Sequence, residues 1–153
     1  MDRKIKLERK TKETEIVMEL NIDGKGVSKI NTSIPFFNHM LELFSLHGFF
    51  DIYIDAKGDT DIDFHHLIED IGIVVGKGFG DAIGDKKGIN RFGTSTVPMD
   101  ESLTSVSIDV SGRPILVYNS GIEKGKIGNF DVELIKEFFK AFSIHSGITI
   151  HIN

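Results

Sequence analysis

Two stretches of this 153-residue chain align with each other and decide the fold that we expect. Residues Phe37–Ile54 read FNHMLELFSLHGFFDIYI, and residues Ile135–Ile152, which begin 98 positions later, read IKEFFKAFSIHSGITIHI. The tetrad FSLH at Phe44–His47 aligns with FSIH at Phe142–His145, and apolar residues also align on both sides of the tetrad. Any helix–turn–strand unit resembles another to some extent, but a tetrad in the same register favours duplication. We therefore expect two similar halves.

Each aligned stretch combines a helical pattern with a strand pattern. Apolar residues recur at helical spacing between Pro35 and Gly48, and proline in the first turn with glycine at the end is typical of helix boundaries. Strict alternation over residues 50–56 indicates a half-buried strand. The same criteria predict helices over 64–83 and 131–146, strands over 14–22 and 27–31 that pair as a hairpin, and strands over 103–110, 114–118 and 148–152.

The two halves are expected to span residues 1–88 and 91–153. Under the shift of 98, the counterpart of the helix over 64–83 would begin near position 163, whereas the sequence ends at Asn153. We therefore expect the second half to be truncated before its last helix.

The helix predicted over 64–83 contains Gly72, Gly76 and Gly80, and each glycine costs about 1 kcal/mol of helix stability relative to alanine. A spacing of four places the three glycines on one face. The favoured interpretation is close packing of this helix on another backbone, because glycine lets two backbones approach. A phosphate-binding glycine loop is the weaker alternative, since no strand runs directly into the segment.

The composition is that of a globular protein, with 40% hydrophobic and 27% charged residues. The absence of cysteine excludes a disulfide framework and any zinc site with thiolate ligands. The apolar runs are too short to span a membrane, and residues 1–15 lack the apolar core of a signal peptide, so we expect a cytoplasmic protein. The net charge of −5 argues against nucleic acid as a partner.

The strongest chemical signal is the adjacent histidine pair in DIDFHHLIED, residues 61–70. On a helix, His65 and Glu69 share a face, so both can hold one metal ion, whereas His66 points about 100° away. Imidazole and carboxylate together suit borderline divalent ions such as Mn²⁺, Fe²⁺ or Zn²⁺. The alternative is a solvated first turn whose acidic residues only favour the helix dipole.

Two further histidines, His39 and His47, lie eight residues apart on nearly one face of the first predicted helix. A satisfied core histidine is the alternative interpretation of each. In the repeat, Glu137 stands at the position of His39, and His145 stands at that of His47. Histidine and glutamate are both metal ligands, so the first exchange favours a metal-ligating role.

Arg91 and Arg113 both adjoin glycine turns. A short glycine turn positions a guanidinium rigidly, which suits the binding of phosphate or carboxylate, and an ordinary surface ion pair is the alternative. Glu13 and Glu101 each stand just before a predicted strand and are candidate acid–base groups.

Five segments occur in order along the chain: PFFNHMLELFSLHGFFDI, GDTDIDFHHLIEDIGI, IGDKKGINRFG, VPMDESL and DVSGRPIL. Together they resemble the imidazoleglycerol-phosphate dehydratase family, and the similarity runs from about Lys10 to the last residue. The resemblance implies an α+β fold of two similar α/β halves, each a four-stranded sheet with helices on one face. This agrees with the internal repeat.

The resemblance also implies an activity. It implies a manganese-dependent hydro-lyase that converts imidazole glycerol phosphate into imidazole acetol phosphate and water in L-histidine biosynthesis. Two Mn²⁺ ions per active site would stabilise the substrate imidazole as an anion and so help hydroxide to leave. In the family, trimers assemble into a homo-oligomer of twenty-four subunits, with the metal site between subunits.

Residue roles follow from the same resemblance. It implies that His65 and Glu69 bind one ion, that His39 and His66 bind the other, and that Glu137 falls at a ligand position. The expected catalytic residues are Glu13, His47 and Glu69. The expected substrate contacts are Glu13, His39, His47 and His65, with Arg91 and Arg113 near the phosphate.

Two features depart from the family pattern. Phe64 precedes the histidine pair where the family has aspartate, and a second His-His-x-x-Glu motif is missing. We therefore expect these 153 residues by themselves to be inactive. The alternative function is a non-catalytic, metal-dependent assembly module. A metallohydrolase using His65, His66 and Glu69 is a weaker reading, because the H-E-x-x-H order is absent.

Overall fold

The structure, a computed structural model, describes residues 3–153. Within that range, no helix is long and apolar enough to cross a membrane. The helices are α1 (Pro35–Gly48), α2 (His65–Ile83) and α3 (Glu133–Ser146). The strands are β1 (Lys4–Lys10), β2 (Thr14–Asn21), β3 (Ser28–Asn31), β4 (Asp51–Gly58), β5 (Phe92–Met99), β6 (Ser102–Asp109), β7 (Ile115–Tyr118), β8 (Lys126–Ile127), β9 (Phe130–Asp131) and β10 (Thr149–Ile152).

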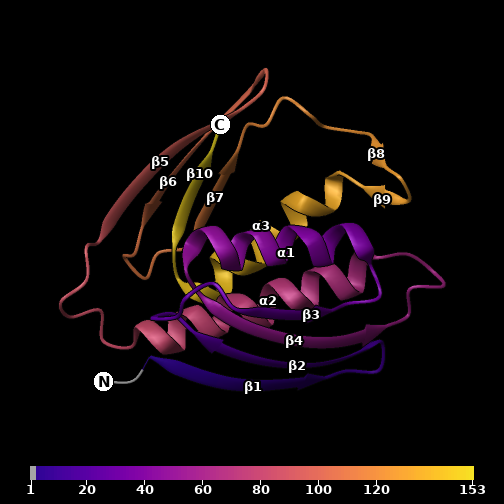
Figure 1. The fold of residues 1–153 in the computed structure, drawn as a ribbon, viewed down its shortest axis with the longest axis horizontal. Helices are drawn as coiled ribbons and strands as arrows, with labels where there is room; N and C mark the ends of the chain where they lie inside the picture. Colours follow the sequence, from indigo (N-terminus) through magenta and orange to yellow (C-terminus); the bar gives the residue numbers. More distant parts are fainter. Residues whose placement is uncertain (1–2) are drawn as a thin grey trace.

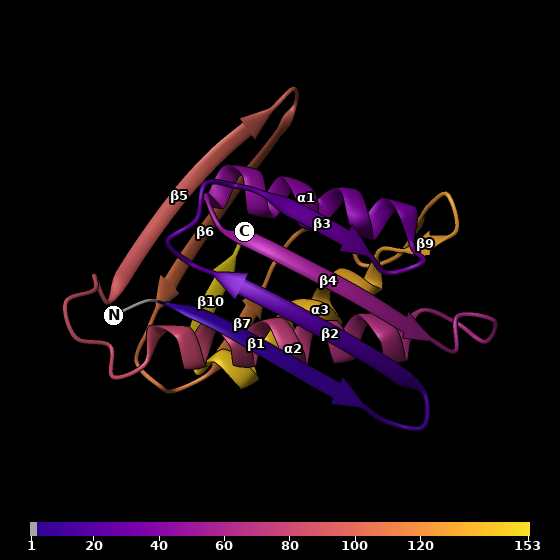
Figure 2. The same ribbon diagram turned by 60° about the horizontal axis from the view of Figure 1, so that its bottom comes forward.

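Two four-stranded sheets of the same topology form the framework of the described chain (Figure 1). The first has the order β1-β2-β4-β3 and the second has the order β5-β6-β10-β7. In each sheet the first three strands are antiparallel neighbours and the last pair is parallel. Helices α1 and α2 cover one face of the first sheet, and α3 lies against the second (Figure 2). The predicted fold class, two similar α/β halves, is confirmed.

The registers of the two sheets match position by position. Lys4 pairs with Asn21 in the first sheet, and Phe92 pairs with Asp109 in the second, which is a shift of 88. The shift becomes 98 at α1 and α3. Strand pairing keeps the shift at 88 for β3 and β7, because Ser28 pairs with Ile52 and Leu116 pairs with Ile150. Ten extra residues are therefore inserted between β7 and α3, in the connection that contains β8 and β9.

The repeated tetrad has a structural cause. Ser45 donates its hydroxyl proton to the carbonyl oxygen of Phe50 at 2.6 Å, and Ser143 donates to that of Ile148 at 2.6 Å. Both serines are buried at the end of a helix. The tetrad recurs because its serine ties the helix end to the strand that follows in each half.

The hairpin predicted between residues 14–22 and 27–31 is wrong. β2 pairs with β1 and β4, whereas β3 lies parallel to β4 on the other side. The partner strand β1 escapes prediction because Ile5 and Leu7 are its only apolar residues. One solvated face of an antiparallel strand leaves few positions that need to be apolar.

The two halves join where α2 crosses α3. A methyl group added at Gly72 would lie 2.7 Å from the carbonyl oxygen of Phe138, and one added at Gly76 would lie 2.5 Å from that of Phe142. At Gly80 the nearest oxygen of α3 would be 3.3 Å away. The predicted close packing of the glycine face on another backbone is confirmed. The glycine-loop alternative is wrong, because the helix is continuous through all three positions.

Aromatic rings from both halves fill the space around this crossing. Phe37 of α1 makes an edge contact with Phe138 of α3, with ring centres 5.4 Å apart. Phe79 of α2 meets Phe142 of α3 at the same distance. Phe130, in the long connection before α3, is fully buried and stacks on Phe37. One hydrophobic core is therefore shared by both sheets.

Replacing Gly76 by alanine is expected to lower the free energy of unfolding by about 2 kcal/mol. Overpacking against a backbone costs about 3 kcal/mol, which exceeds the helix-propensity gain of about 1 kcal/mol. Urea unfolding followed by circular dichroism measures the change. Gly80→Ala is the matched control, because its methyl group has more room, and we expect a change below about 1 kcal/mol. Equal destabilisation by the two variants would contradict the packing argument.

Candidate active site

The site is built around the first turn of α2. Asp63 accepts a hydrogen bond from the backbone N–H of His65 at 2.7 Å, which satisfies one of the free donors at the helix start. Phe64 is half-buried and packs against the hydrophobic core. The helix therefore begins at the histidine pair, with an apolar residue anchoring the preceding position.

His65 and Glu69 lie on one face of α2, as their spacing of four predicts. The Nε2 atom of His65 is 3.7 Å from a carboxylate oxygen of Glu69, and each side chain is 45% exposed. Both side chains can therefore reach a solute. An imidazole nitrogen and a carboxylate oxygen at this separation can be two ligands of one divalent ion.

His66 points to a different partner. Its Nδ1 atom lies 2.9 Å from a carboxylate oxygen of Asp59, in the loop between β4 and α2. This hydrogen bond raises the pKa of the His66 imidazole above its ordinary value. Because Asp59 occupies Nδ1, the ring presents Nε2 to a ligand, an arrangement found around metal-bound histidines.

Glu13 stands beside His66 and Asp59. It lies in the turn between β1 and β2, and its carbonyl oxygen accepts the backbone N–H of Asp59 at 3.1 Å. The β1–β2 turn and the β4–α2 loop lie at the same end of the first sheet (Figure 2). The fold therefore brings Glu13 next to the histidine pair from 52 positions away in the sequence.

The histidines of α1 are both exposed, so the alternative of a core histidine is wrong for each. Eight residues of helix separate His39 from His47, a rise of about 12 Å. Glu137 on α3 is half-buried and forms an ion pair with Lys140 at 3.4 Å. His39 lies near the start of α1 and His47 near its end, so the two histidines are separated by about two turns of helix.

The two arginines lie elsewhere. The start of β5 and the β6–β7 turn are at the opposite end of the molecule from the β1–β2 turn (Figure 1). Arg91 donates from Nε and Nη2 to the two carboxylate oxygens of Asp109 at 2.6 and 3.0 Å. These bonds hold the pKa of Asp109 below its ordinary value. Arg3, the counterpart of Arg91 in the repeat, likewise donates from Nε and Nη2 to the two carboxylate oxygens of an aspartate, Asp23. We call this two-bond arrangement a fork.

Among residues 3–153, no three or more histidine, aspartate or glutamate side chains gather closely enough to hold one metal ion. The described chain instead presents two pairs, His65 with Glu69 and His66 with Asp59. Each of these pairs therefore brings together two side chains of the kinds that bind metal ions, and no third one joins either pair in the described chain.

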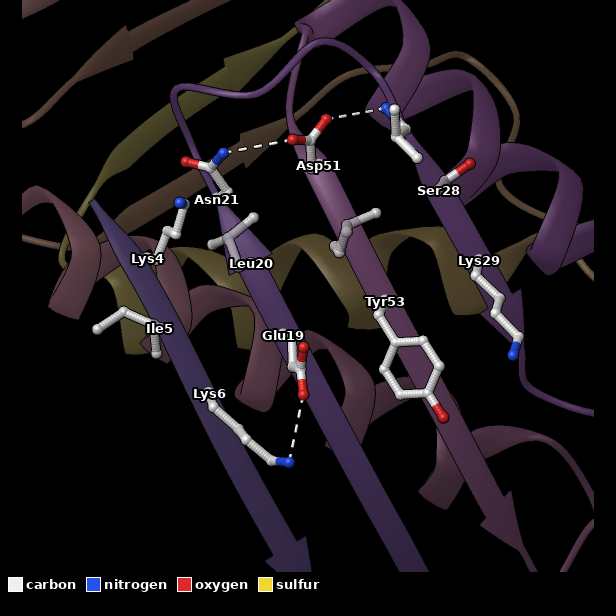
Figure 3. A pocket seen from close by; sticks show the side chains of 12 residues that line it. Lys4, Ile5, Lys6, Glu19, Leu20, Asn21, Ser28, Lys29, Asp51 and Tyr53 are labelled. Carbon is white, nitrogen blue, oxygen red and sulfur yellow. Dashed lines mark hydrogen bonds and ion pairs between the residues drawn. The ribbon is translucent and has the colours of Figure 1, made fainter. Parts of the chain in front are cut away.

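A hollow on the outer face of the first sheet lies apart from these groups (Figure 3). Lys6 pairs there with Glu19 at 3.2 Å, and the Lys29 ammonium lies 5.7 Å from the ring centre of Tyr53. Asp51 accepts backbone N–H groups of the β2–β3 connection. The hollow contains none of the candidate site residues, and its charged groups support the sheet and its turns.

Comparison with known proteins identifies the family. A family model described as imidazoleglycerol-phosphate dehydratase matches residues 32–153. The imidazoleglycerol-phosphate dehydratase of Geobacter sulfurreducens is 58% identical over 153 residues, which are 100% of this chain and 78% of that protein. The chain belongs to the imidazoleglycerol-phosphate dehydratase family. The Acetivibrio thermocellus member is 51% identical over 152 residues, covering 99% of this chain and 78% of that protein.

Solved structures of the family share the fold. The Staphylococcus aureus enzyme superposes with a TM-score of 0.87 at 41% identity, covering 98% of this chain and 82% of that one. The Pyrococcus furiosus enzyme, solved in complex with (S)-C348, gives a TM-score of 0.81 at 35% identity, covering 96% and 78%. The chain is thus a member of a family of histidine-biosynthesis dehydratases, as the resemblance implied.

Sequence reasoning missed the residues that support the site. They are Asp59, which bonds to His66, and Asp70, whose oxygens accept hydrogen bonds from Arg9 and Thr14. No sequence motif distinguishes them, because single acidic residues and threonines are common in loops and near helix starts. The one available signal for Asp70 is an acid on the apolar face of the α2 pattern, between Leu67 and Ile71.

In the metal-free protein, Asp59→Asn is expected to lower the pKa of His66 toward its ordinary value, because the charged acceptor is lost. The stabilising effect of a raised histidine pKa is fully present below pH about 6.5 and is lost as pH rises through the raised pKa. The variant should therefore lose stability mainly at acidic pH. NMR titration of the His66 ring measures the pKa, and Asp61→Asn is the control. An unshifted His66 would refute the pairing.

Proposed function

We propose that the protein catalyses the metal-assisted dehydration of imidazole glycerol phosphate to imidazole acetol phosphate and water in L-histidine biosynthesis. The observation that supports this most directly is the pairing of His65 with Glu69 beside His66 and Glu13, at one end of the first sheet. Membership of the dehydratase family supplies the substrate class, a small phosphorylated imidazole.

The donor set fits the proposed metal, Mn²⁺, with two ions per active site. Exposed imidazole and carboxylate groups at 3.7 Å suit a borderline divalent ion, and the Asp59 bond orients His66 as a ligand. The proposed ligands are His39, His65, His66, Glu69 and Glu137. When bound, the ions act as Lewis acids that stabilise negative charge on the substrate ring.

The chain's own residues account for the proton movements. Loss of water removes hydroxide from the side-chain carbon next to the ring and a proton from the neighbouring carbon, and the resulting enol becomes the ketone. These proton transfers need an exposed carboxylate whose backbone is fixed by hydrogen bonds, and we assign them to Glu13. Glu69 and His47 are proposed as further catalytic groups.

Phosphate binding is assigned to Arg113 and Arg91. Arg91 uses Nε and Nη2 to bind Asp109, which holds its side chain in place. We assign the phosphate contact to the N–H groups of Arg91 that Asp109 does not bind, together with the guanidinium of Arg113. In the folded molecule, the turns that carry the two arginines lie at the opposite end from the first turn of α2. We therefore propose that a complete site is formed between copies of a homo-oligomer, with trimers and a 24-subunit assembly as the expected states.

The second candidate is a non-catalytic, metal-dependent assembly module. It is favoured by the separation of the ligands, since the described chain brings together only pairs of them. A metal ion held by such pairs would join copies whether or not a reaction follows.

One experiment separates the two functions. Purified protein is mixed with Mn²⁺ and imidazole glycerol phosphate, product formation is measured, and mass is followed by light scattering with and without metal. Turnover supports the dehydratase. Metal-dependent assembly without turnover supports the module and agrees with the expectation of an inactive 153-residue chain. The absence of both turnover and metal-dependent assembly refutes both functions.

Glu13→Gln is expected to lower kcat about a hundredfold or more, because the amide cannot exchange protons. Glu15→Gln is the matched control: Glu15 lies two residues further along and forms a surface ion pair with Lys10 at 2.8 Å. Its kcat should stay within about twofold, since exposed ion pairs contribute little. Steady-state kinetics at saturating Mn²⁺ measure both variants. A Glu13→Gln enzyme with full kcat would remove this residue from the mechanism.

A further inference from the structure

Asp70 is a buried carboxylate on the face of α2 that packs against the first sheet. Its side chain is 11% exposed. Arg9 of β1 donates to one of its oxygens at 2.9 Å, and the hydroxyl group of Thr14, at the start of β2, donates to the other. Leu67 and Ile71, its neighbours on the same helix, are fully buried.

Stability alone does not require a charge at this position. Burying an ion pair removes hydration that the mutual attraction only partly restores, and well-packed apolar residues are often as stable or more stable there. A carboxylate adds directionality, because its oxygens only accept hydrogen bonds and every partner must point a donor at it.

The direction of these bonds can be followed from Asp70 to Glu13. Thr14 donates its single hydroxyl proton to Asp70, so the 3.1 Å contact between the hydroxyl groups of Thr11 and Thr14 must be donated by Thr11. The Thr11 oxygen in turn accepts the backbone N–H of Glu13 at 3.1 Å. The carboxylate therefore orients a chain of hydroxyl groups that ends at the Glu13 backbone.

A second connection holds the other side of the same residue. The carbonyl oxygen of Glu13 accepts the backbone N–H of Asp59, whose carboxylate bonds to His66. His66 and Asp70 are one helical turn apart on α2. Both backbone polar groups of Glu13 are thus tied, through short hydrogen-bonded paths, to the same turn of the same helix.

We propose that Asp70, acting through Thr14 and Thr11, is a positioning residue that fixes the location of the Glu13 backbone relative to the first turn of α2. The inference rests on the proposed function, in which Glu13 exchanges protons with the substrate. Apolar contacts between α2 and the sheet are not directional, so they do not by themselves set the distance between the start of α2 and the β1–β2 turn. The carboxylate–hydroxyl bonds remove that freedom where the catalytic groups must keep a fixed separation.

The test compares Thr14→Val, which keeps the shape but removes the hydroxyl group, with Thr14→Ser, which retains it. Asp70→Asn is the third variant. Ser143→Ala is the matched control, because it removes a buried hydroxyl group of the other half that has no connection to Glu13. Hydrogen–deuterium exchange of the peptides containing residues 11–14 and 59 reports on the mobility of the β1–β2 turn and of the loop bonded to it. Steady-state kinetics at saturating Mn²⁺ report on catalysis.

Thr14→Val and Asp70→Asn are expected to speed exchange at the turn about tenfold and to lower kcat about ten- to a hundredfold, with KM within about threefold. Thr14→Ser should restore both properties. Ser143→Ala should lower thermal stability without changing turn exchange or kcat.

Unchanged turn exchange in Thr14→Val overturns the proposal, and so does faster exchange with full kcat. An equal loss of kcat in Ser143→Ala also overturns it, because general loosening would then be sufficient. Absence of turnover in the unaltered protein refutes the proposed function itself. Turnover that Thr14→Val leaves intact refutes only the positioning role.

Discussion

The close contact between α2 and α3 is the constraint on which the rest of the structure depends. Glycines at every fourth position of α2 let its backbone approach that of α3 so closely that a methyl group at Gly76 would lie 2.5 Å from a carbonyl oxygen. The contact brings the two sheets onto one core, which the rings of Phe79 and Phe142 fill. It also fixes the middle of the helix whose N-terminal end carries His65, His66 and Glu69. A fixed helix axis is required before the groups at its end can have a defined geometry.

The repeat supplies the frame, and the candidate site is built from features in which the two halves differ. Equivalent serines tie the helix end to the next strand in both halves, and equivalent arginines form forks with aspartates at the start of each sheet. The frame is thus built twice by the same interactions. The hydroxyl chain from Asp70 to Glu13 belongs to the first half, and the long connection that carries Phe130 belongs to the second. The start of α2, with its two histidines, and the turns that carry the arginines lie at opposite ends of the molecule.

Local patterns predicted the helices closely. The predicted helix over 64–83 is observed as His65–Ile83, and Pro35–Gly48 has the predicted bounds. The strands β1 and β5 escaped prediction for different reasons. β1 has only two apolar residues, and β5 is exposed at every position, so burial imposes no alternating pattern on it. Of the site, the shared face of His65 and Glu69 followed from helical spacing. The bonds of Asp59 and Asp70 did not, since they join segments that only the fold brings together.

The sequence by itself determined the duplication, the three helices, the glycine face and the family, because each is carried by residue spacing along one segment or by segments in fixed order. Only the tertiary structure decided which strands are neighbours, that β3 lies beside β4 and not beside β2, and that Glu13 stands next to the histidine pair. Strand pairing is set by the burial of whole sheet faces, and burial depends on every element at once. A hydrogen bond between positions 14 and 70 leaves no periodic trace in the sequence, so it becomes visible only when α2 is laid on the sheet.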